Sequence, residues 1–423
     1  MIDINLIRSE KEKVTEALKK RVSDISFDEL LVWDEEKRKL GTKRDEMKNR
    51  RNVISKQIPQ MKKENKNADE AIGEMQELGD LIAEHDKKYA ELEKKIYDFL
   101  IMLPNIPDNE VPAGGKENNE VISVYGEKPN FSFSVKDHVA LAKDIHLIDY
   151  ERGVKIAGSG NWIYTGLGAQ LEWALLNFFI DQHLKDNWQF FLLPHMLNKE
   201  CGLTAGQFPK FSDDVFWLAS ESADEKFLLP TAETALVNVH YQEILQEEEL
   251  PKKYFAFTPC YRKEAGSSRA SERGTVRGHQ FNKVEMVQYT SEKQSDQAFE
   301  EMLKKAENLM QQLGLHYQVS KLAADDCSAA MAKTYDIEVW IPSMGEYKEV
   351  SSVSNSRDYQ ARRGNMKYRD NNDEKKFMHT LNASGLATSR LLPAILEQNQ
   401  QADGSVKIPK ILRPYINNLE KIE

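Results

Sequence analysis

The sequence predicts an α+β protein with an antiparallel α-helical coiled-coil arm near its N-terminus. Two observations indicate this class. Residues 27–103 hold a recurrent apolar seam and a single proline, Pro59, which is typical of long helices that pair as a coiled coil. After Pro104, strand-like and helix-like segments mix, as in an α+β body. With 423 residues, 40% of them hydrophobic, the chain can form one large body and an appendage.

Two long helices account for the seam, because apolar residues recur at a spacing of about 3.5 residues. The seam positions are Trp33, Leu40, Met47, Ile54 and Met61 with Leu30 and Ile58, then Met75, Leu78, Ile82, His85, Tyr89, Leu92, Ile96, Phe99 and Leu103. We expect the helices to be joined near residues 59–66. At about 1.5 Å per residue, residues 27–61 would reach roughly 50 Å, so the arm should project.

Charge is unevenly shared along this arm. Between Lys37 and Lys66 there are twelve Lys and Arg residues and three acids, a local balance of +9, whereas residues 69–93 hold nine acids and two lysines. A solvated coiled coil with complementary helices explains this pattern, and so does an arm that binds a phosphate backbone. The charges alone leave both interpretations open. The candidate nucleic-acid contacts are Lys43, Arg44, Lys48, Arg50 and Arg51, of which Arg44 and Arg51 occupy seam positions.

The remaining composition limits the class of protein. The formal net charge is −10, so any nucleic-acid contact requires a local basic patch. No signal-peptide core and no membrane-length apolar run is present. Cys201, Cys260 and Cys327 are widely spaced and odd in number, which argues against a disulfide framework and against a zinc site. We therefore expect a cytoplasmic protein with no membrane partner and no zinc.

A stretch rich in Pro, Gly and Asn follows the arm and predicts a linker. The expected domains are therefore a helical domain at residues 1–103, a linker at 104–130 and the α+β body at 131–423.

A charged hairpin is the most informative segment of the body. Residues 253–262 and 279–290 alternate apolar and polar side chains, which predicts two strands around a Gly/Ser-rich loop. Since alternate side chains share a face, Arg262 and Glu264 should point the same way. The same parity groups, on the returning strand, Arg277, His279, Phe281, Lys283 and Glu285. Guanidinium forks suit phosphates and an aromatic ring suits a base, so this face predicts a nucleotide site. An exposed, salt-bridged hairpin is the alternative.

The hairpin, with FTPCYRKE at 257–264 and RGHQFNKVE at 277–285, resembles motif 2 of the class II aminoacyl-tRNA synthetases. In detail it is similar to the bacterial seryl-tRNA synthetases, and the arm resembles that family's tRNA-binding coiled coil. The resemblance covers nearly the whole chain. Its segments are motif 1 at 168–194, the Thr-x-Glu loop at 229–233, motif 2 at 254–290 and motif 3 at 381–398.

The resemblance implies an antiparallel sheet flanked by helices and a homodimer formed through motif 1. It implies a serine–tRNA ligase that activates L-serine with ATP and Mg²⁺ to seryl-adenylate, then transfers the seryl group to tRNA(Ser) and also to tRNA(Sec). A diverged synthetase is the alternative, either an antibiotic-resistant second copy or a ligase for a non-tRNA acceptor. A non-catalytic coiled-coil protein is a further alternative, although a scaffold has no use for the arginines and carboxylates of these motifs.

The resemblance also implies roles in ATP binding. Arg262 would hold the α-phosphate together with the serine carboxylate, and Glu264 would accept the adenine amino group. Arg277 and Arg390 would hold the γ-phosphate, while Phe281 and Arg390 would cover the two faces of adenine. The implied ATP-binding residues are Arg262, Lys263, Glu264, Arg277, Phe281, Glu349, Val350, Ser351, Ser352 and Arg390.

The other implied roles concern Mg²⁺ and serine. Glu349 and Ser352 would bind Mg²⁺, which prefers oxygen ligands. Glu285 would accept the serine hydroxyl, and a buried acceptor of this kind rejects an amino acid that lacks the hydroxyl. The implied serine-binding residues are Thr231, Ala232, Glu233, Arg262, Glu285, Asn382 and Ser384, with Thr231 and Glu233 on the ammonium group.

Three stretches depart from the commonest family pattern. They are the motif 2 loop at 266–273, where Glu272 is unusual, the segment 322–327, and the pair Val353 and Ser356. The first departure concerns how the loop would meet the tRNA acceptor end. The other two lie close in sequence to the expected active-site strands.

Overall fold

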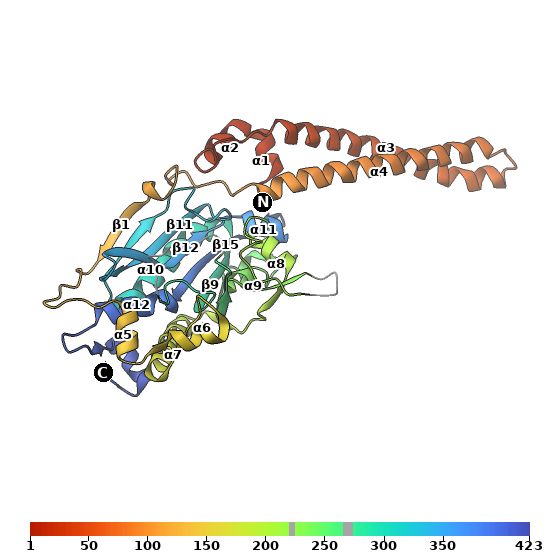
Figure 1. Ribbon diagram of the computed structural model, residues 1–423. Helices are drawn as coiled ribbons and strands as arrows, with labels where there is room; N and C mark the ends of the chain where they lie inside the picture. The colour runs from red at the N-terminus through yellow and green to blue at the C-terminus, as the bar shows by residue number, and fades with distance from the viewer. Residues whose placement is uncertain (220–224, 265–273) are drawn as a thin grey trace. The chain divides into compact units, whose positions relative to one another are not determined.

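The computed structural model describes residues 1–219, 225–264 and 274–423, leaving aside the side chain of Leu386. The chain divides into two compact units (Figure 1). The arm unit comprises residues 2–16 and 24–103, and the body unit comprises Met1, residues 17–23 and residues 104–423. No helix among the described residues is both long and apolar enough to cross a membrane.

Two long antiparallel helices, α3 (Asp28–Lys63) and α4 (Asp69–Met102), form the arm. The short helices α1 (Ile4–Ser9) and α2 (Lys11–Leu18) precede them. The buried seam positions are Leu30, Ile54, Ile58, Ile82, Leu92, Ile96 and Leu103, and Leu100, outside the predicted seam, is buried as well.

The joint between the helices differs from the sequence prediction. Pro59 was expected to start the turn, but it lies inside α3, which continues to Lys63. Ile58 and Ala68 form a buried cluster with Met61 on the two sides of the turn. Burying this apolar surface offsets the single backbone hydrogen bond that a proline forgoes in a helix.

The middle of the arm has a polar seam. Leu40 and Met47 are only half-buried there. The Arg44 guanidinium lies 4.4 Å from the ring centre of Tyr89 and 3.5 Å from the Asp86 carboxylate. Cation–π and ionic contacts therefore replace aliphatic packing across this part of the helix pair.

The body is built on an eight-stranded sheet with the order β1-β10-β11-β12-β15-β9-β8-β4. Each neighbouring pair is antiparallel except β4 and β8, which are parallel. The strands are β1 (Glu120–Tyr125), β4 (Gln189–Phe191), β8 (Lys252–Tyr261), β9 (Gln280–Thr290), β10 (Tyr317–Lys321), β11 (Lys333–Ile341), β12 (Glu346–Asn355) and β15 (His379–Ala387). Residues 104–130, expected to be a linker, thus include the edge strand β1.

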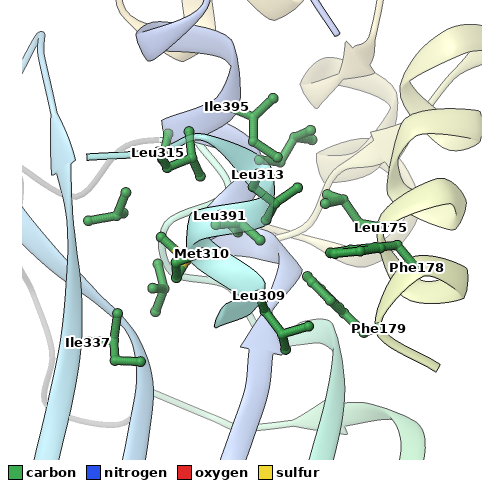
Figure 2. Close-up of a cluster of buried hydrophobic side chains, with 14 of the residues drawn as sticks. Leu175, Phe178, Phe179, Leu309, Met310, Leu313, Leu315, Ile337, Leu391 and Ile395 are labelled. Carbon is green, nitrogen blue, oxygen red and sulfur yellow. The ribbon is translucent and has the colours of Figure 1, made fainter. Parts of the chain in front are cut away.

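Three helices pack on the sheet: α7 (Gly166–Lys185), α10 (Ser295–Leu313) and α12 (Thr388–Gln398). Their apolar side chains meet in one core (Figure 2), where labelled residues include Leu175, Phe178, Phe179, Leu309, Leu313, Ile337, Leu391 and Ile395. Gly314, with a φ of +70°, ends α10 in the left-handed conformation that glycine adopts without strain.

Shorter elements complete the body. The helices are α5 (His138–Asp144), α6 (Tyr150–Ala157), α8 (Lys199–Thr204), α9 (Ala232–Leu236) and α11 (Tyr359–Gly364), and 3₁₀ turns lie at Lys116–Asn118, Glu247–Glu249, Glu292–Gln294 and Lys410–Ile416. The minor strands are β2 (Ile148–Asp149), β3 (Ile163–Tyr164), β5 (Met196–Asn198), β6 (Lys226–Leu228), β7 (Ile244–Gln246), β13 (Lys367–Arg369), β14 (Lys375–Phe377), β16 (Val406–Lys407) and β17 (Lys421–Ile422).

The predicted hairpin is confirmed as β8 and β9, with strand ends within one residue of the expected ones. Arg262 and Glu264 both lie beyond the end of β8, and Glu264 has a φ of +52°, so strand alternation does not govern their directions. Both nevertheless line one small cavity. The predicted loop at 266–273, including Glu272, falls outside the described residues.

Candidate active site

A cavity of about 510 Å³ opens in the body unit. Its lining comes from segments far apart in the chain: the ends of β8 and β9, the strands β11, β12 and β15, and the start of α12. Among the predicted residues, the lining includes Thr231, Glu233, Arg262, Arg277, Glu349, Ser352, Asn382, Ser384 and Arg390. A smaller adjoining cavity adds Glu264 and Phe281. The sheet therefore brings together most of the predicted site.

One end of the cavity, here called the acidic end, is formed by Thr231, Glu233, Asn382 and Ser384 in front of the fully buried Glu285. Thr231 Oγ1 donates to Glu285 Oε2 at 3.3 Å, and Asn382 Nδ2 donates to Glu285 Oε1 at 3.4 Å. Glu285 also forms an ion pair with Lys283. The predicted hydroxyl acceptor thus lies behind the cavity wall, in contact with three lining side chains, those of Thr231, Lys283 and Asn382.

Glu233 occupies the first turn of α9. Thr231 caps this helix, since its Oγ1 accepts from the Glu233 backbone N–H at 3.3 Å. Burial raises the pKa of the Glu233 carboxyl to about 7, and the negative charge of Glu285 adds to this shift. Gln360, Lys283 and Arg262 act in the opposite direction on the same pKa. The Glu233 carboxyl, which could contact a cation in the cavity, therefore titrates near neutral pH.

The other end, here called the arginine end, is formed by Arg262, Arg277, Glu349, Ser352 and Arg390. Arg262 Nε donates to the Pro230 carbonyl at 3.2 Å, and its guanidinium lies 5.2 Å from the ring centre of Phe281. Arg277 is paired with Glu264. Cations and an aromatic ring therefore gather at this part of the cavity and the small cavity beside it.

Glu349 and Ser352 form a pair of oxygen donors in this end. Ser352 Oγ donates to Glu349 Oε1 at 3.1 Å, and Arg390 Nη1 donates to Glu349 Oε2 at 2.8 Å. Burial alone would raise the pKa of Glu349, but Arg390 and Ser352 bring that pKa below its usual value. An ionised carboxylate next to a hydroxyl is a donor set that fits Mg²⁺. Among the described residues, no three His, Cys, Asp or Glu side chains are grouped as a metal site.

Comparison with known proteins decides the family. Residues 1–107 match the family described as "Seryl-tRNA synthetase N-terminal domain", and residues 216–399 match "tRNA synthetase class II core domain (G, H, P, S and T)". The chain is 58% identical over 420 residues to serine–tRNA ligase 2 of Clostridium acetobutylicum, a match that covers 98% of this chain and 99% of that protein. The chain belongs to the seryl-tRNA synthetase family.

Further relatives agree with this assignment. Serine–tRNA ligase of Thermodesulfovibrio yellowstonii is 44% identical over 422 residues, covering 98% of this chain and 99% of that protein. The crystal structure of Pyrococcus horikoshii seryl-tRNA synthetase complexed with ATP matches with a TM-score of 0.92 at 33% identity, covering 100% of this chain and 99% of that chain. The predicted class II fold is confirmed, and the chain is a ligase that forms aminoacyl-tRNA. Nothing in these relatives favours the alternative functions.

Besides Glu285, four residues named from the family resemblance do not line the cavity with their side chains. Ala232 and Val350 are buried in the core, and Lys263 is exposed. Ser351 is fully buried, with its Oγ donating to the Ser384 carbonyl at 2.6 Å. Their implied part in a seryl-tRNA synthetase site would have to come from the backbone.

Sequence reasoning also missed residues of this synthetase cavity. Val276 lines both cavities and accepts a hydrogen bond from Arg390 Nε through its carbonyl at 3.2 Å. Asp336, on β11 beside Ser352 of β12, also lines the cavity. Burial raises the pKa of its carboxyl well above the usual value. Gln360 lies behind Glu233. Only Lys283 carried a sequence signal, since it shares the hairpin face with Glu285.

The unusual stretches lie close to the cavity where the structure describes them. Leu322 and Asp326 line it, while Val353 is buried in the core. Ser356 is fully buried, and its Oγ lies 2.5 Å from Thr380 Oγ1 and 3.0 Å from the Thr380 carbonyl oxygen.

The five arm candidates divide into two groups. Arg44 and Lys48 both approach Asp86, and Arg50 pairs with Glu74 at 2.8 Å, so these three hold α3 against α4. Lys43 and Arg51 are exposed, and in the described part of the chain no carboxylate lies within ion-pair distance of them. The arm thus uses part of its positive charge within the coiled coil.

Proposed function

We propose that this chain activates L-serine with ATP in the cavity and then transfers the seryl group to tRNA(Ser). The observation that carries the proposal is that Arg262 lines the same cavity as Glu233 and Glu349 and acts electrostatically on both carboxylates. An arginine within reach of both groups can hold the serine carboxylate against the α-phosphate, as the reaction requires.

At the arginine end, Arg262 would hold the α-phosphate and Phe281 would stack on adenine. Arg277 and Arg390 would turn to the γ-phosphate, and Glu264, released from Arg277, would accept the adenine amino group. Glu349 and Ser352 would hold Mg²⁺, which would neutralise charge on the phosphates. The serine carboxylate attacks the α-phosphorus and pyrophosphate leaves, so this step needs no protein base.

At the acidic end, Glu233 and Thr231 would receive the serine ammonium group, with Asn382 and Ser384 beside it. Glu285 would accept the serine hydroxyl. The contacts from Thr231 and Asn382 to Glu285, at 3.3 and 3.4 Å, are long for hydrogen bonds. A substrate hydroxyl at a shorter distance would displace them.

In the second step, a terminal hydroxyl of the tRNA attacks the carbonyl carbon of seryl-adenylate, and AMP leaves. We propose that exposed cations of the arm, Lys43 and Arg51 among them, bind the phosphate backbone of tRNA(Ser), and that tRNA(Sec) is a second acceptor. The expected division into residues 1–103, 104–130 and 131–423 remains our proposal for the domains.

We also propose a homodimer, formed through α7 and β4. The exposed apolar side chains of Trp173, Leu184 and Leu192 on and beside these elements support this interface. The three cysteines are free thiols, which suits a reducing compartment, and we propose that the protein is cytoplasmic.

Exchange of pyrophosphate into ATP, measured with each of the twenty amino acids in turn, tests the proposed function. We expect exchange that depends on serine and on Mg²⁺, followed by charging of tRNA(Ser). Exchange with another amino acid and none with serine would refute the substrate assignment.

Replacing Glu285 with alanine should weaken serine use and reduce discrimination against alanine by roughly 10- to 100-fold, since the wild-type carboxylate offers the serine hydroxyl a charged acceptor that alanine cannot use. The measurement is kcat/KM for serine and for alanine in the exchange assay. Unchanged selectivity would mean that another group reads the hydroxyl.

Reversing Lys43 and Arg51 to glutamate should raise the KM for tRNA and lower the slope of log affinity against log salt by about 1 to 2, because each phosphate contact releases a counterion. The matched control is reversal of Lys88 and Lys94 on α4, which pair within their own helix with Glu84 and Asp98. An equal effect of both double reversals would point to net charge alone.

A further inference from the structure

A line of hydrogen bonds leads from the cavity wall into the body. Gln360, on α11, is buried behind Glu233, and its Nε2 donates both to Glu233 Oε1 and to the Ala205 carbonyl, each at 3.0 Å. Gln360 Oε1 accepts from Thr380 Oγ1 at 2.6 Å. Thr380 Oγ1 lies 2.5 Å from Ser356 Oγ. Gln360, Thr380 and Ser356 are absent from the cavity lining.

The donors and acceptors of this line have one consistent direction. An amide oxygen can only accept, so Thr380 gives its single hydroxyl hydrogen to Gln360. Thr380 Oγ1 must then accept from Ser356. The Gln360 oxygen is held on the Thr380 side, and its NH₂ group is therefore turned to Glu233. A flipped amide would set its oxygen against the Glu233 carboxylate and lose the hydrogen bond to Ala205.

This direction matters for the chemistry at Glu233. A donor that contacts a carboxylate favours the ionised form, and one Glu233 oxygen is held by Gln360 while the other remains for a ligand. The opposing influences are burial and the charge of Glu285 on β9, whereas Lys283 on β9 and Arg262 at the end of β8 act with Gln360. Among these groups that shift the pKa of Glu233, only Gln360 is uncharged, so its effect on that pKa depends on how its amide is oriented.

We propose that Gln360 is a positioning residue for amino-acid binding, which holds the Glu233 carboxylate as the acceptor of the substrate's ammonium group, and that Thr380 and Ser356 hold Gln360. The inference rests on the proposed role of Glu233. It assigns to Ser356, one of the unusual residues of the sequence, the first donor of the line.

Three single variants test the proposal in the full-length protein by serine-dependent ATP–pyrophosphate exchange between pH 6 and 9. Gln360→Met keeps the length of the side chain and removes the donor. We expect it to raise the KM for serine roughly 10- to 100-fold and to leave the KM for ATP unchanged. In the wild type, kcat/KM for serine should rise with pH as Glu233 ionises near pH 7. In Gln360→Met this rise should move to higher pH, because a group that lowers the pKa is lost.

Thr380→Val and Thr380→Ser form the matched pair. Valine has the shape of threonine but frees the Gln360 amide, so we expect a smaller change in the same direction as for Gln360→Met. Serine keeps the hydroxyl and should restore wild-type values. The double variant Gln360→Met with Thr380→Val should be no worse than Gln360→Met, because the two residues act through one contact.

The outcomes separate the possible failures. An equal rise in KM for serine and for ATP, or a pH profile that does not move, would reduce Gln360 to a structural role and overturn the proposal. A Thr380→Ser variant as impaired as Thr380→Val would remove Thr380 from the line. Absence of serine-dependent exchange in the wild type would refute the proposed function itself, before any variant is compared.

Discussion

Replacing Arg262 with alanine is expected to lower kcat/KM for serine-dependent ATP–pyrophosphate exchange by roughly a thousandfold, or about 4 kcal/mol of transition-state stabilisation. The guanidinium would contact charge that develops on the α-phosphate, where a preorganised donor is worth more than in water. A second effect adds to the first. Arg262 lowers the pKa of both Glu233 and Glu349, so its removal would leave the two carboxylates less ionised.

Two variants accompany this measurement. Arg262→Lys keeps the charge without the planar fork and should recover only part of the loss. Arg369→Ala, on β13, removes an arginine that pairs with Asp373 and does not line the cavity, and it should stay within about twofold of the wild type. Activity of Arg262→Ala within about threefold of the wild type would exclude the proposed contact.

Shortening the arm should separate the two half-reactions. Removal of residues 45–86, with a short Gly/Ser turn in their place, keeps the base of the arm, where Phe27 and Trp33 pack on Phe99 at 6.4 and 6.2 Å between ring centres. Serine-dependent exchange should remain close to the wild-type rate. Charging of tRNA(Ser) should fall by roughly three orders of magnitude, the scale of losing several phosphate contacts.

The shortened protein provides its own control, because exchange measures the reaction in the cavity and charging measures transfer to the tRNA. Circular dichroism should show a loss of helix limited to the excised segments. If the shortened protein charges tRNA(Ser) as well as the full chain, the basic residues of the arm do not bind tRNA, and the arm is a solvated coiled coil.

Much of the fold could be predicted because its signals are local. The repeat of the arm and the alternation of β8 and β9 appear within a few turns or residues of sequence. Long-range pairing could not be predicted in the same way. The strand β1 pairs with β10, about two hundred residues away, and a stretch rich in Pro and Gly concealed it. At Pro59, packing around Ile58 outweighed a local helix-breaking signal.

The candidate site shows the same division. Family motifs on the hairpin placed Arg262, Arg277 and Phe281 beside the cavities. The Gln360 contact with Glu233 could not be read from the sequence, because it joins two helices that no repeat or motif relates. In the arm, the partners of Arg44 and Arg50 lie on the opposite helix, so the sequence could not show which cations are already engaged.

The joint between the two helices of the arm also has a mechanical consequence. Leucine seams tolerate a slip of one heptad, because one leucine can replace another. A slip of one heptad would place Lys37 or Arg51 opposite Tyr89 and Asp86 in place of Arg44, so these contacts alone do not exclude it. The joint opposes it, because only residues 64–68 separate α3 from α4 and the helix ends would have to move about 10 Å relative to each other. The two helices therefore keep one register. The arm has a constant length, so any molecule that binds along it meets its side chains at fixed distances.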